Sequence, residues 1–398
     1  MKQTIVTLPG DGIGKIVLEE AIRVLDAVGF KANYVEGDIG WEFWCKEGNP
    51  LPERTIQLIE NHKTALFGAI TSKPKEEAFN ELAPELKEKG LVYFSPIVGL
   101  RQHFNLDICL RPCRSYKGNP LNFIRRGANG TVEEPLVDVA IFRQNTEGLY
   151  GGVEWSNPPA KVYDALMTHP KFVKNFGHVP VEELSVSTRI FTKKATQRIL
   201  HAAFSHARKY NYRSVTLCEK PNVIRETSGM MYKMAREMQK SEFPEIELWN
   251  TNIDAQMMWL TKNPEDYGVI VAGNMFGDIV SDAFAGLIGG LGFACSAQIN
   301  PDSGIGVFEP THGSAPKYAD FQVSIVNPVA MIESACMMLD HLEEQQTAQK
   351  IRQAIAEVIL EGNVQTYDMK KLPGSPDVLQ KGAVSTQQMT DAIISKLK

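Results

Sequence analysis

The stretch TIVTLPGDGIGKIVLEEAIRVLDAV, residues 4–28, decides the fold class of this chain. Residues Thr4–Leu8 are apolar and rich in β-branched side chains, as expected of a buried strand, and glycines follow at once. Residues Lys15–Val28 carry apolar side chains at three- and four-residue spacing, which predicts a helix with one buried face. That face comprises Ile16, Val17, Ala21, Val24 and Leu25. A strand, a glycine turn and a helix form the repeating unit of an α/β protein.

The same alternation continues along the chain. Further strands are predicted at Ala65–Ile70, Val137–Phe142, Ser214–Cys218 and Gly268–Ala272. The last of these is a continuous apolar run, which is typical of a strand buried in a parallel sheet. A late helix is predicted from an apolar stripe made of Ile351, Ala354, Ile355, Val358 and Ile359. We therefore expect an α/β fold with a largely parallel sheet.

Two segments interrupt this pattern. Residues 153–185 contain several prolines and little periodicity, which indicates an inserted arm. Residues 298–328 are rich in Gly, Pro and Ser, and we predict a long structured loop there. Loops of that length in compact domains are usually functional.

Composition excludes several classes of protein. The chain has 398 residues and a net charge of −5, which argues against nucleic-acid or membrane-surface binding because both need a basic face. No apolar stretch approaches the about 20 residues of a membrane span, and because the N-terminal residues lead directly into the first predicted strand, we expect no signal peptide. The six cysteines are scattered, which favours reduced thiols and a cytoplasmic location.

The glycines of Pro9–Lys15, PGDGIGK, follow a strand and open a helix. Their spacing is G-x-G-x-G, whereas the dinucleotide fingerprint is G-x-G-x-x-G. A phosphate-binding P-loop is also excluded, because Ile16 follows Lys15 where Ser or Thr is required. A tight strand-to-helix turn explains these glycines without any ligand.

Three arginines lie beside strands or turns, at Arg101, Arg111 and Arg143. Each one alone is explained as a surface residue. Guanidinium groups grip carboxylates through two hydrogen bonds, so three of them near strand ends indicate a pocket for an anion.

Asp278 and Asp282 follow a buried strand and a glycine, and a spacing of four places them on one face of a helix. Two like charges there repel each other unless a cation lies between them. Helix capping is the alternative reading, because aspartate is favoured at a helix N-terminus. Carboxylates suit Mg²⁺ or Mn²⁺, and we therefore predict a metal site.

Two further features carry weaker signals. Lys220 leaves the end of an apolar strand, where partial burial can tune its proton affinity. The stretch EPTHGSAPKY, residues 309–318, contains small residues that let a backbone approach a phosphate or a ring closely. His312 alone is explained as a structural histidine, but in that setting it is a candidate contact for an adenine or a ribose.

In this order the motifs resemble the β-decarboxylating dehydrogenases, which act on isocitrate, isopropylmalate, homoisocitrate, tartrate or D-malate. The resemblance runs from LPGDGIG near residue 9 to QTYDMKKL near residue 370 and is closest to isocitrate dehydrogenase. It implies the isocitrate/isopropylmalate dehydrogenase-like α/β fold, whose cofactor loop is not a Rossmann fingerprint.

The resemblance also assigns roles to individual residues. It implies that Arg101, Arg111 and Arg143 hold the substrate carboxylates, with Ser95 and Asn222 as further substrate contacts. Tyr150 and Lys220 match the catalytic tyrosine and lysine, and Asp278 matches an aspartate with both a catalytic and a metal role. The implied metal ligands are Asp254, Asp278 and Asp282.

The implied cofactor contacts are Glu309, His312, Gly313, Ser314, Ala315, Lys317, Tyr318, Asn327, Tyr367 and Lys371. Asp254 matches an aspartate supplied by a neighbouring subunit, which implies a homodimer with shared active sites. On that basis we expect Lys220 and Asp254 to act in one site from different chains. The implied domains are a large domain of residues 1–104 and 305–398, a small domain of 105–149 and 190–304, and a clasp-like insertion of 150–189.

The resemblance implies metal-dependent oxidation and decarboxylation of a 2-hydroxy polycarboxylic acid, with isocitrate giving 2-oxoglutarate as the first choice. Ile97 stands where the isocitrate pattern has asparagine, so homoisocitrate, 3-isopropylmalate, D-malate and tartrate remain alternatives. Lys317, Tyr318, Tyr367 and Lys371 favour NADP, and Asp320 nearby keeps NAD open as the alternative. A catalytically idle regulatory subunit is an alternative of another class, although intact Lys220 and Tyr150 argue against it.

Overall fold

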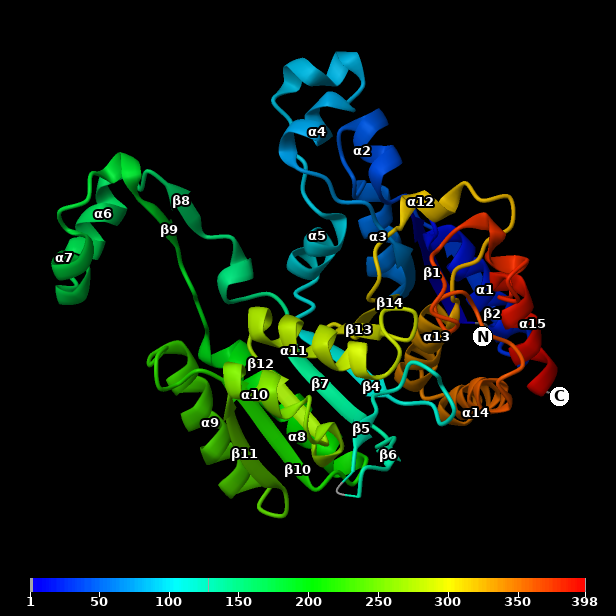
Figure 1. Ribbon diagram of the computed structural model, residues 1–398. Coiled ribbons are helices and arrows are strands. Elements are labelled where there is room, and N and C mark those ends of the chain that lie inside the picture. The colour runs from blue at the N-terminus through cyan, green and yellow to red at the C-terminus, as the bar shows by residue number, and fades with distance from the viewer. Residues whose placement is uncertain (1–2, 128, 398) are drawn as a thin grey trace.

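The computed structural model describes residues 3–127 and 129–397, which fold around one ten-stranded sheet (Figure 1). Its strand order is β11-β10-β12-β7-β4-β13-β14-β3-β1-β2. The bounds in chain order are β1 Gln3–Gly10, β2 Ala32–Glu36, β3 Thr64–Ala69, β4 Ile108–Arg114, β7 Asp138–Gln144, β10 Ser214–Glu219, β11 Glu247–Asn252, β12 Val269–Ala272, β13 Cys295–Asn300 and β14 Ile305–Pro310. The neighbours of β1, β3, β10 and β12 run parallel to them, whereas β4 and β13 run antiparallel to their neighbours. The predicted α/β class and largely parallel sheet are confirmed.

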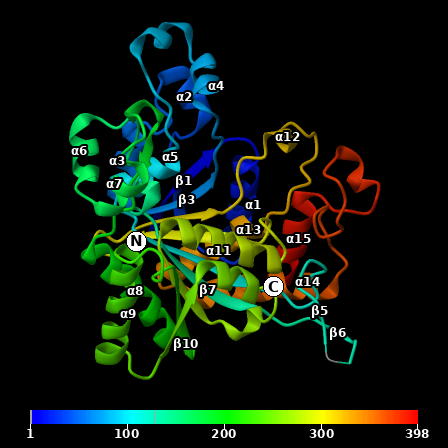
Figure 2. The ribbon, with the colours of Figure 1, turned by 60° about the vertical axis from the view of Figure 1, so that its left-hand side comes forward.

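Helices cover both faces of the sheet, and the two ends of the chain share one half of the molecule (Figures 1 and 2). That half contains α1 Gly14–Ala27, α2 Trp41–Glu47, α3 Glu53–His62, α4 Lys75–Asn80, α5 Pro96–His103, α12 Pro316–Ala319, α13 Val329–His341, α14 Gln345–Glu361 and α15 Thr386–Lys396. The middle of the chain forms the other half, with α8 Lys193–Lys209, α9 Thr227–Glu242, α10 Ile253–Trp259 and α11 Asn274–Leu287.

The predicted helical faces form the core. All five residues of the stripe in 351–359 are buried on α14, as expected. On α1, Val17, Ala21, Val24 and Leu25 are buried, but Ile16 is half-exposed and Leu18 is buried in its place. Val17 and Leu18 belong to the same hydrophobic cluster as residues of α13 and α14, so the first and last parts of the chain share one core.

The proline-rich segment does project as an arm (Figure 1). It holds a two-stranded ribbon, β8 Glu154–Ser156 with β9 Ser185–Ser187, and two short helices, α6 Ala160–Met167 and α7 Pro170–Phe176. Neither helix contains a buried residue, so the arm has no core of its own within this chain.

The prediction of a long loop over residues 298–328 is wrong for its first part. Residues 295–310 form the β13–β14 hairpin, which turns at Gly304 with a positive φ of 70°. Ile305, Val307 and Phe308 are all buried. The loop was predicted from the average composition of residues 298–328, in which glycines and prolines outweigh this short apolar strand. Only the region after Pro310 is irregular, apart from the short α12.

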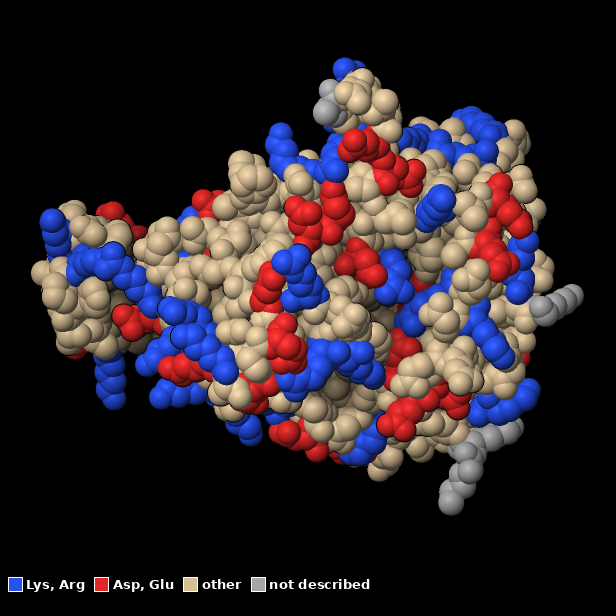
Figure 3. All heavy atoms as spheres, turned by 90° about the horizontal axis from the view of Figure 1, so that it is seen from below, with Lys and Arg blue, Asp and Glu red and all other residues tan. Residues whose placement is uncertain are grey.

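Acidic and basic side chains are interspersed over the face of the molecule seen in Figure 3, and no extended field of one sign covers it. Among the described residues, no helix has both the length and the apolar character needed to cross a membrane.

Candidate active site

Two buried arginines meet the aspartates of α11 on one face of the sheet. Arg111 of β4 donates from Nη1 to Asp278 Oδ1 (3.0 Å), to Ser281 Oγ (2.7 Å) and to Asp282 Oδ1 (3.1 Å). Arg143, on the neighbouring β7, donates to Asp278 as well. Antiparallel pairing of these two strands therefore brings together four of the residues singled out in the sequence.

The sequence patterns did not indicate the residues that position these two guanidinium groups. Arg143 donates from Nε (3.0 Å) and Nη2 (2.8 Å) to Oδ1 of Asn274, the first residue of α11. Ser281 accepts from Arg111, as described above. Asn274 lies in the quoted GNMFGDIVSD motif, but only its charged residues suggested chemistry.

The electrostatics of this cluster suit a multiply charged acid. Burial and the neighbouring Arg111 lower the pKa of Arg143 to about 10, so this guanidinium remains charged at neutral pH. Burial also raises the pKa of Asp282, and Arg111 opposes that shift. Two adjacent cations that hold carboxylates of the protein can hold carboxylates of a ligand by the same hydrogen bonds.

Tyr150 lies beside this cluster, in a short 3₁₀ turn at Leu149–Gly151. The Arg143 guanidinium is 5.6 Å from the centroid of its ring. Burial and the Asp278 carboxylate raise the pKa of Tyr150. The phenol therefore keeps its proton at neutral pH and is available as a donor.

Arg101 approaches from another element, near the end of α5. Its Nε donates to Gln298 Oε1 (2.6 Å), and its Nη2 lies 3.5 Å from Oε1 of the buried Glu309. Gln298 also accepts from Asn145 (2.9 Å). Ser95 immediately precedes α5. The hairpin β13–β14 thus anchors the third arginine, a role that the sequence pattern did not indicate for Gln298.

Lys220 follows β10 and forms an ion pair with Asp254 of the same chain, in the first turn of α10. The hydrogen bond from Lys220 lowers the pKa of Asp254. The expectation that these two residues act from different chains is wrong, because the adjacent parallel strands β10 and β11 deliver both to one place. Asn222 lies exposed in the turn just after Lys220.

Asp254 does not join Asp278 and Asp282 within one chain. Among the described residues, no three His, Cys, Asp or Glu side chains are arranged to hold a metal ion. Asp278 and Asp282 supply two carboxylates on one helical face, which are oxygen ligands of the kind that Mg²⁺ and Mn²⁺ prefer. The single chain therefore fits part of a metal site, and the side chain of Asp254 is 68% exposed.

The predicted cofactor loop packs against the glycine turn of the first strand. The Ile13 amide donates to Ser314 O (2.9 Å), and a Cβ at Gly12 would lie 2.2 Å from that oxygen. The hydroxyl groups of Ser314 and Thr71 share a hydrogen bond (2.7 Å). Nδ1 of His312 lies 3.0 Å from the carbonyl oxygen of Gly313, and Ala315 adopts a positive φ of 39°. The glycines at residues 10–14 thus serve close packing of two loops.

His312 leaves one polar atom for a ligand. Its Nε2 is buried without a hydrogen-bond partner among the described residues, and burial lowers the pKa of the ring. A neutral imidazole with a free nitrogen fits a neutral heterocyclic base. This observation agrees with a nicotinamide dinucleotide in the loop.

The residues expected near a 2′-phosphate come together from two distant segments. Tyr318 and Tyr367 have ring centroids 5.6 Å apart, and the hydrogen bond from Tyr367 lowers the pKa of Tyr318. Lys317 Nζ lies 4.6 Å from the Tyr318 ring centroid, and Lys371 has a positive φ of 55° just after this segment. Asn327 instead lies just before α13, where its Oδ1 accepts from the Val329 amide (3.1 Å).

Comparison with known proteins adds an independent line of evidence. The profile of the isocitrate/isopropylmalate dehydrogenase family matches residues 4–393. The chain is 39% identical to the protein DlpA of Legionella pneumophila over 98% of its own length, but spans only 58% of the length of that relative. It is 34% identical to homoisocitrate dehydrogenase of Methanocaldococcus jannaschii, covering 98% of this chain and 96% of the relative. Isocitrate dehydrogenase from Methylococcus capsulatus superposes with a TM-score of 0.80 at 33% identity, over 99% of both chains.

Proposed function

Because this chain belongs to the isocitrate/isopropylmalate dehydrogenase family, we propose that it converts isocitrate to 2-oxoglutarate with NADP and a divalent metal. The chain is an NAD(P)-dependent decarboxylating dehydrogenase. The observation that carries the proposal for the substrate is the buried Arg111–Arg143 pair, which already holds two carboxylates of the protein. A polycarboxylic acid offers the same groups.

We assign the metal to Asp278 and Asp282 of one chain and Asp254 of the partner subunit, in a homodimer. When bound, Mg²⁺ or Mn²⁺ supplies Lewis acidity to the substrate hydroxyl and stabilises the charge left by decarboxylation. Lys220 is paired with Asp254 and would enter the same site beside it. The exposed carboxylate of Asp254 and the incomplete donor set within one chain both support this assembly.

In this assignment the remaining steps belong to side chains of the protein. Arg101, Arg111 and Arg143 orient the carboxylates of the acid, and Lys220 takes part in removing the hydroxyl proton. Tyr150 then returns a proton to carbon, because its raised pKa keeps the phenol protonated at neutral pH. The loop around His312 would hold the nicotinamide cofactor, which would supply the hydride acceptor.

We also propose the domain division implied by the family, with residues 1–104 and 305–398 in the large domain and 105–149 with 190–304 in the small one. The shared core of α1, α13 and α14 supports the first of these. The projecting arm supports a clasp of residues 150–189 between two subunits. Six free cysteines favour a reducing, cytoplasmic location.

A panel of candidate acids tests the substrate. Purified chain with Mn²⁺ and NADP is expected to produce reduced nicotinamide, followed by absorbance, faster with isocitrate than with homoisocitrate, 3-isopropylmalate, D-malate or tartrate. Faster turnover of another acid would replace isocitrate as the substrate. Failure with every acid and both nicotinamides would favour an idle regulatory subunit.

Ile97 is the residue that separates these acids. It is half-buried against the hydrophobic cluster that contains Leu100 and cannot donate a hydrogen bond to a third carboxylate. Ile97→Asn is expected to raise kcat/KM for isocitrate by about tenfold, because a hydrogen bond to a charged group contributes about 1.5–3 kcal/mol. The neighbouring exposed Val98→Asn is the control, and equal effects of the two substitutions would contradict this role for Ile97.

The choice of NADP is tested at Lys317. Lys317→Asp removes a cation and adds an anion beside the Tyr318–Tyr367 pair, so kcat/KM for NADP is expected to fall by about tenfold or more. The value for NAD, which lacks the 2′-phosphate, is expected to stay level or rise. Lys350→Asp on α14 controls for the change in net charge. A wild-type preference for NAD would overturn the assignment and direct attention to Asp320.

A further inference from the structure

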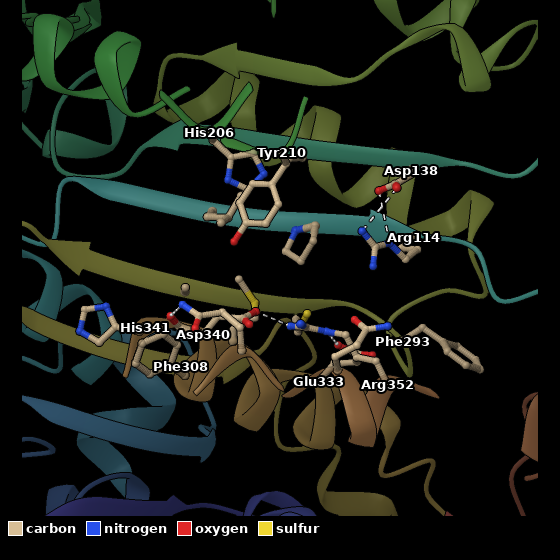
Figure 4. A pocket seen from close by; sticks show the side chains of 18 of the residues that line it. Arg114, Asp138, His206, Tyr210, Phe293, Phe308, Glu333, Asp340, His341 and Arg352 are labelled. Carbon is tan, nitrogen blue, oxygen red and sulfur yellow. Dashed lines mark hydrogen bonds and ion pairs between the residues drawn. The ribbon is translucent and has the colours of Figure 1, made fainter. Parts of the chain in front are cut away.

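A cavity of about 460 Å³ lies over the face of the sheet opposite the arginine site (Figure 4). Its floor comes from the central strands β4, β7, β13 and β14, and includes Leu110, Ala140 and Ala297. Side chains on a strand alternate between the two faces, so Arg111 reaches the α11 side while Leu110 and Pro112 line the cavity. The two sites therefore share strands but not side chains.

The cavity is built into the pairing of the strands. Pairing between β4 and β13 ends at Leu110 with Ala297, although both strands continue beyond this point. Pro112 follows, and proline has no amide hydrogen to donate to a neighbouring strand. The sheet pairing between β4 and β13 therefore stops beside the cavity, so part of its floor is set by the backbone.

The walls come from the two halves of the molecule. His206 and Tyr210 lie on one side, at the end of α8, and Phe308 and His341 lie on the other side (Figure 4). The His206 ring stacks on Tyr212, with an interplanar angle of 17° and centroids 5.9 Å apart. Rings on both walls favour a flat ligand that can stack or pack edge to face.

Charge in the lining is already paired within the protein. Arg114 is 3.3 Å from Asp138, and Arg352 pairs with Glu333 (3.2 Å) and Asp340 (2.7 Å). Burial lowers the pKa of His206 to about 4 and also lowers that of His341, so both rings are neutral near pH 7. A charged ligand would have to break one of these pairs, whereas an uncharged one would not.

We propose that this cavity is a binding site for a small, flat, uncharged aromatic or heteroaromatic molecule. Its volume lies within the range of about 300–1,000 Å³ found for small-molecule sites, and its floor is apolar, while the charged side chains of the lining are paired with one another. Gln345 and Gln349 of α14 supply amide groups at the rim of the cavity. The cavity contains none of the arginines or aspartates of the candidate active site, so ligand binding there does not depend on the proposed reaction.

The test uses the full-length chain and the neutral fluorescent probe N-phenyl-1-naphthylamine. Saturable emission is expected with one site per chain, and excess NADP and isocitrate are expected to leave the bound probe in place. Gln349→Trp, at an exposed position on the rim, should block the mouth and weaken binding at least tenfold. Gln346→Trp, on the same helix but outside the lining, should leave binding unchanged.

Ala140→Leu, which fills the floor, is a second variant that should weaken binding, with a thermal melt to establish that it folds. Because Gln349 is exposed, its variant remains informative if the Ala140 variant does not fold. The proposal is overturned if the probe does not bind, if NADP displaces it, or if folded Gln349→Trp protein binds it as wild type does.

Discussion

Asp278→Asn is expected to reduce turnover by about a thousandfold or more at saturating Mn²⁺, because the loss of several kcal/mol of charge stabilisation costs a factor of ten for each 1.36 kcal/mol. Asp278 is a proposed metal ligand and also accepts from both Arg111 and Arg143. Steady-state rates with isocitrate measure the effect. Asp26→Asn, an exposed position on α1, is the matched control and should retain wild-type turnover.

Removal of the metal should produce a related effect that can be measured without turnover. Asp278 cannot be fully committed to a metal and to two guanidinium groups together, so metal binding would free the arginines for the acid. Chelation should therefore abolish turnover and also weaken isocitrate binding in calorimetry, and added Mn²⁺ should restore both. Full turnover of metal-stripped protein in excess chelator would contradict the assignment.

A mixture of Asp278→Asn and Lys220→Ala chains, each inactive alone, is expected to recover about a quarter of wild-type activity after subunit exchange. Random pairing makes half of the dimers heterodimers, and each of these would have one intact site of two. Recovery is expected because Lys220 and Asp254 are paired on one chain, whereas the proposed site takes Asp278 from the other chain. Activity is measured after the heterodimer has been demonstrated by native mass spectrometry.

The matched control is a mixture of Lys220→Ala with Asp254→Asn. Because these two residues come from the same chain, no heterodimer of this kind has a complete site, and no recovery is expected. Recovery in this mixture, or none in the first, would contradict the way in which the site is proposed to be shared.

Local patterns predicted the parts of this fold that depend on local sequence. The apolar runs before Pro9 and Gly273 became buried strands, because continuous apolar strands belong to the interior of a parallel sheet. The hairpin over residues 295–310 was missed, since its buried strands flank a turn rich in Gly and Pro and a composition averaged over both reads as loop.

The sequence predicted which residues belong to the candidate site, but not which of them contact one another. Asp278 and Asp282 could be placed on one face from their spacing alone. That Arg111 binds both follows from the antiparallel register of β4 with β7, which no local pattern encodes. The partnership of Lys220 with Asp254 depends in the same way on two strands lying side by side.

The position of β14 has a consequence for the order in which the chain acquires structure during synthesis. β3 pairs with β1 on one side and with β14 on the other, and β14 is translated only after the whole middle of the chain. Contacts so distant in sequence form slowly, because a long loop must close first. When β1, β2 and β3 have been translated, one edge of β3 is therefore still without its partner, whereas β7, β10, β11 and β12, whose parallel partners all lie within this group, are translated before β14. The half that contains both termini should thus be the last to become native, and its nascent edge is the one that a chaperone would have to protect.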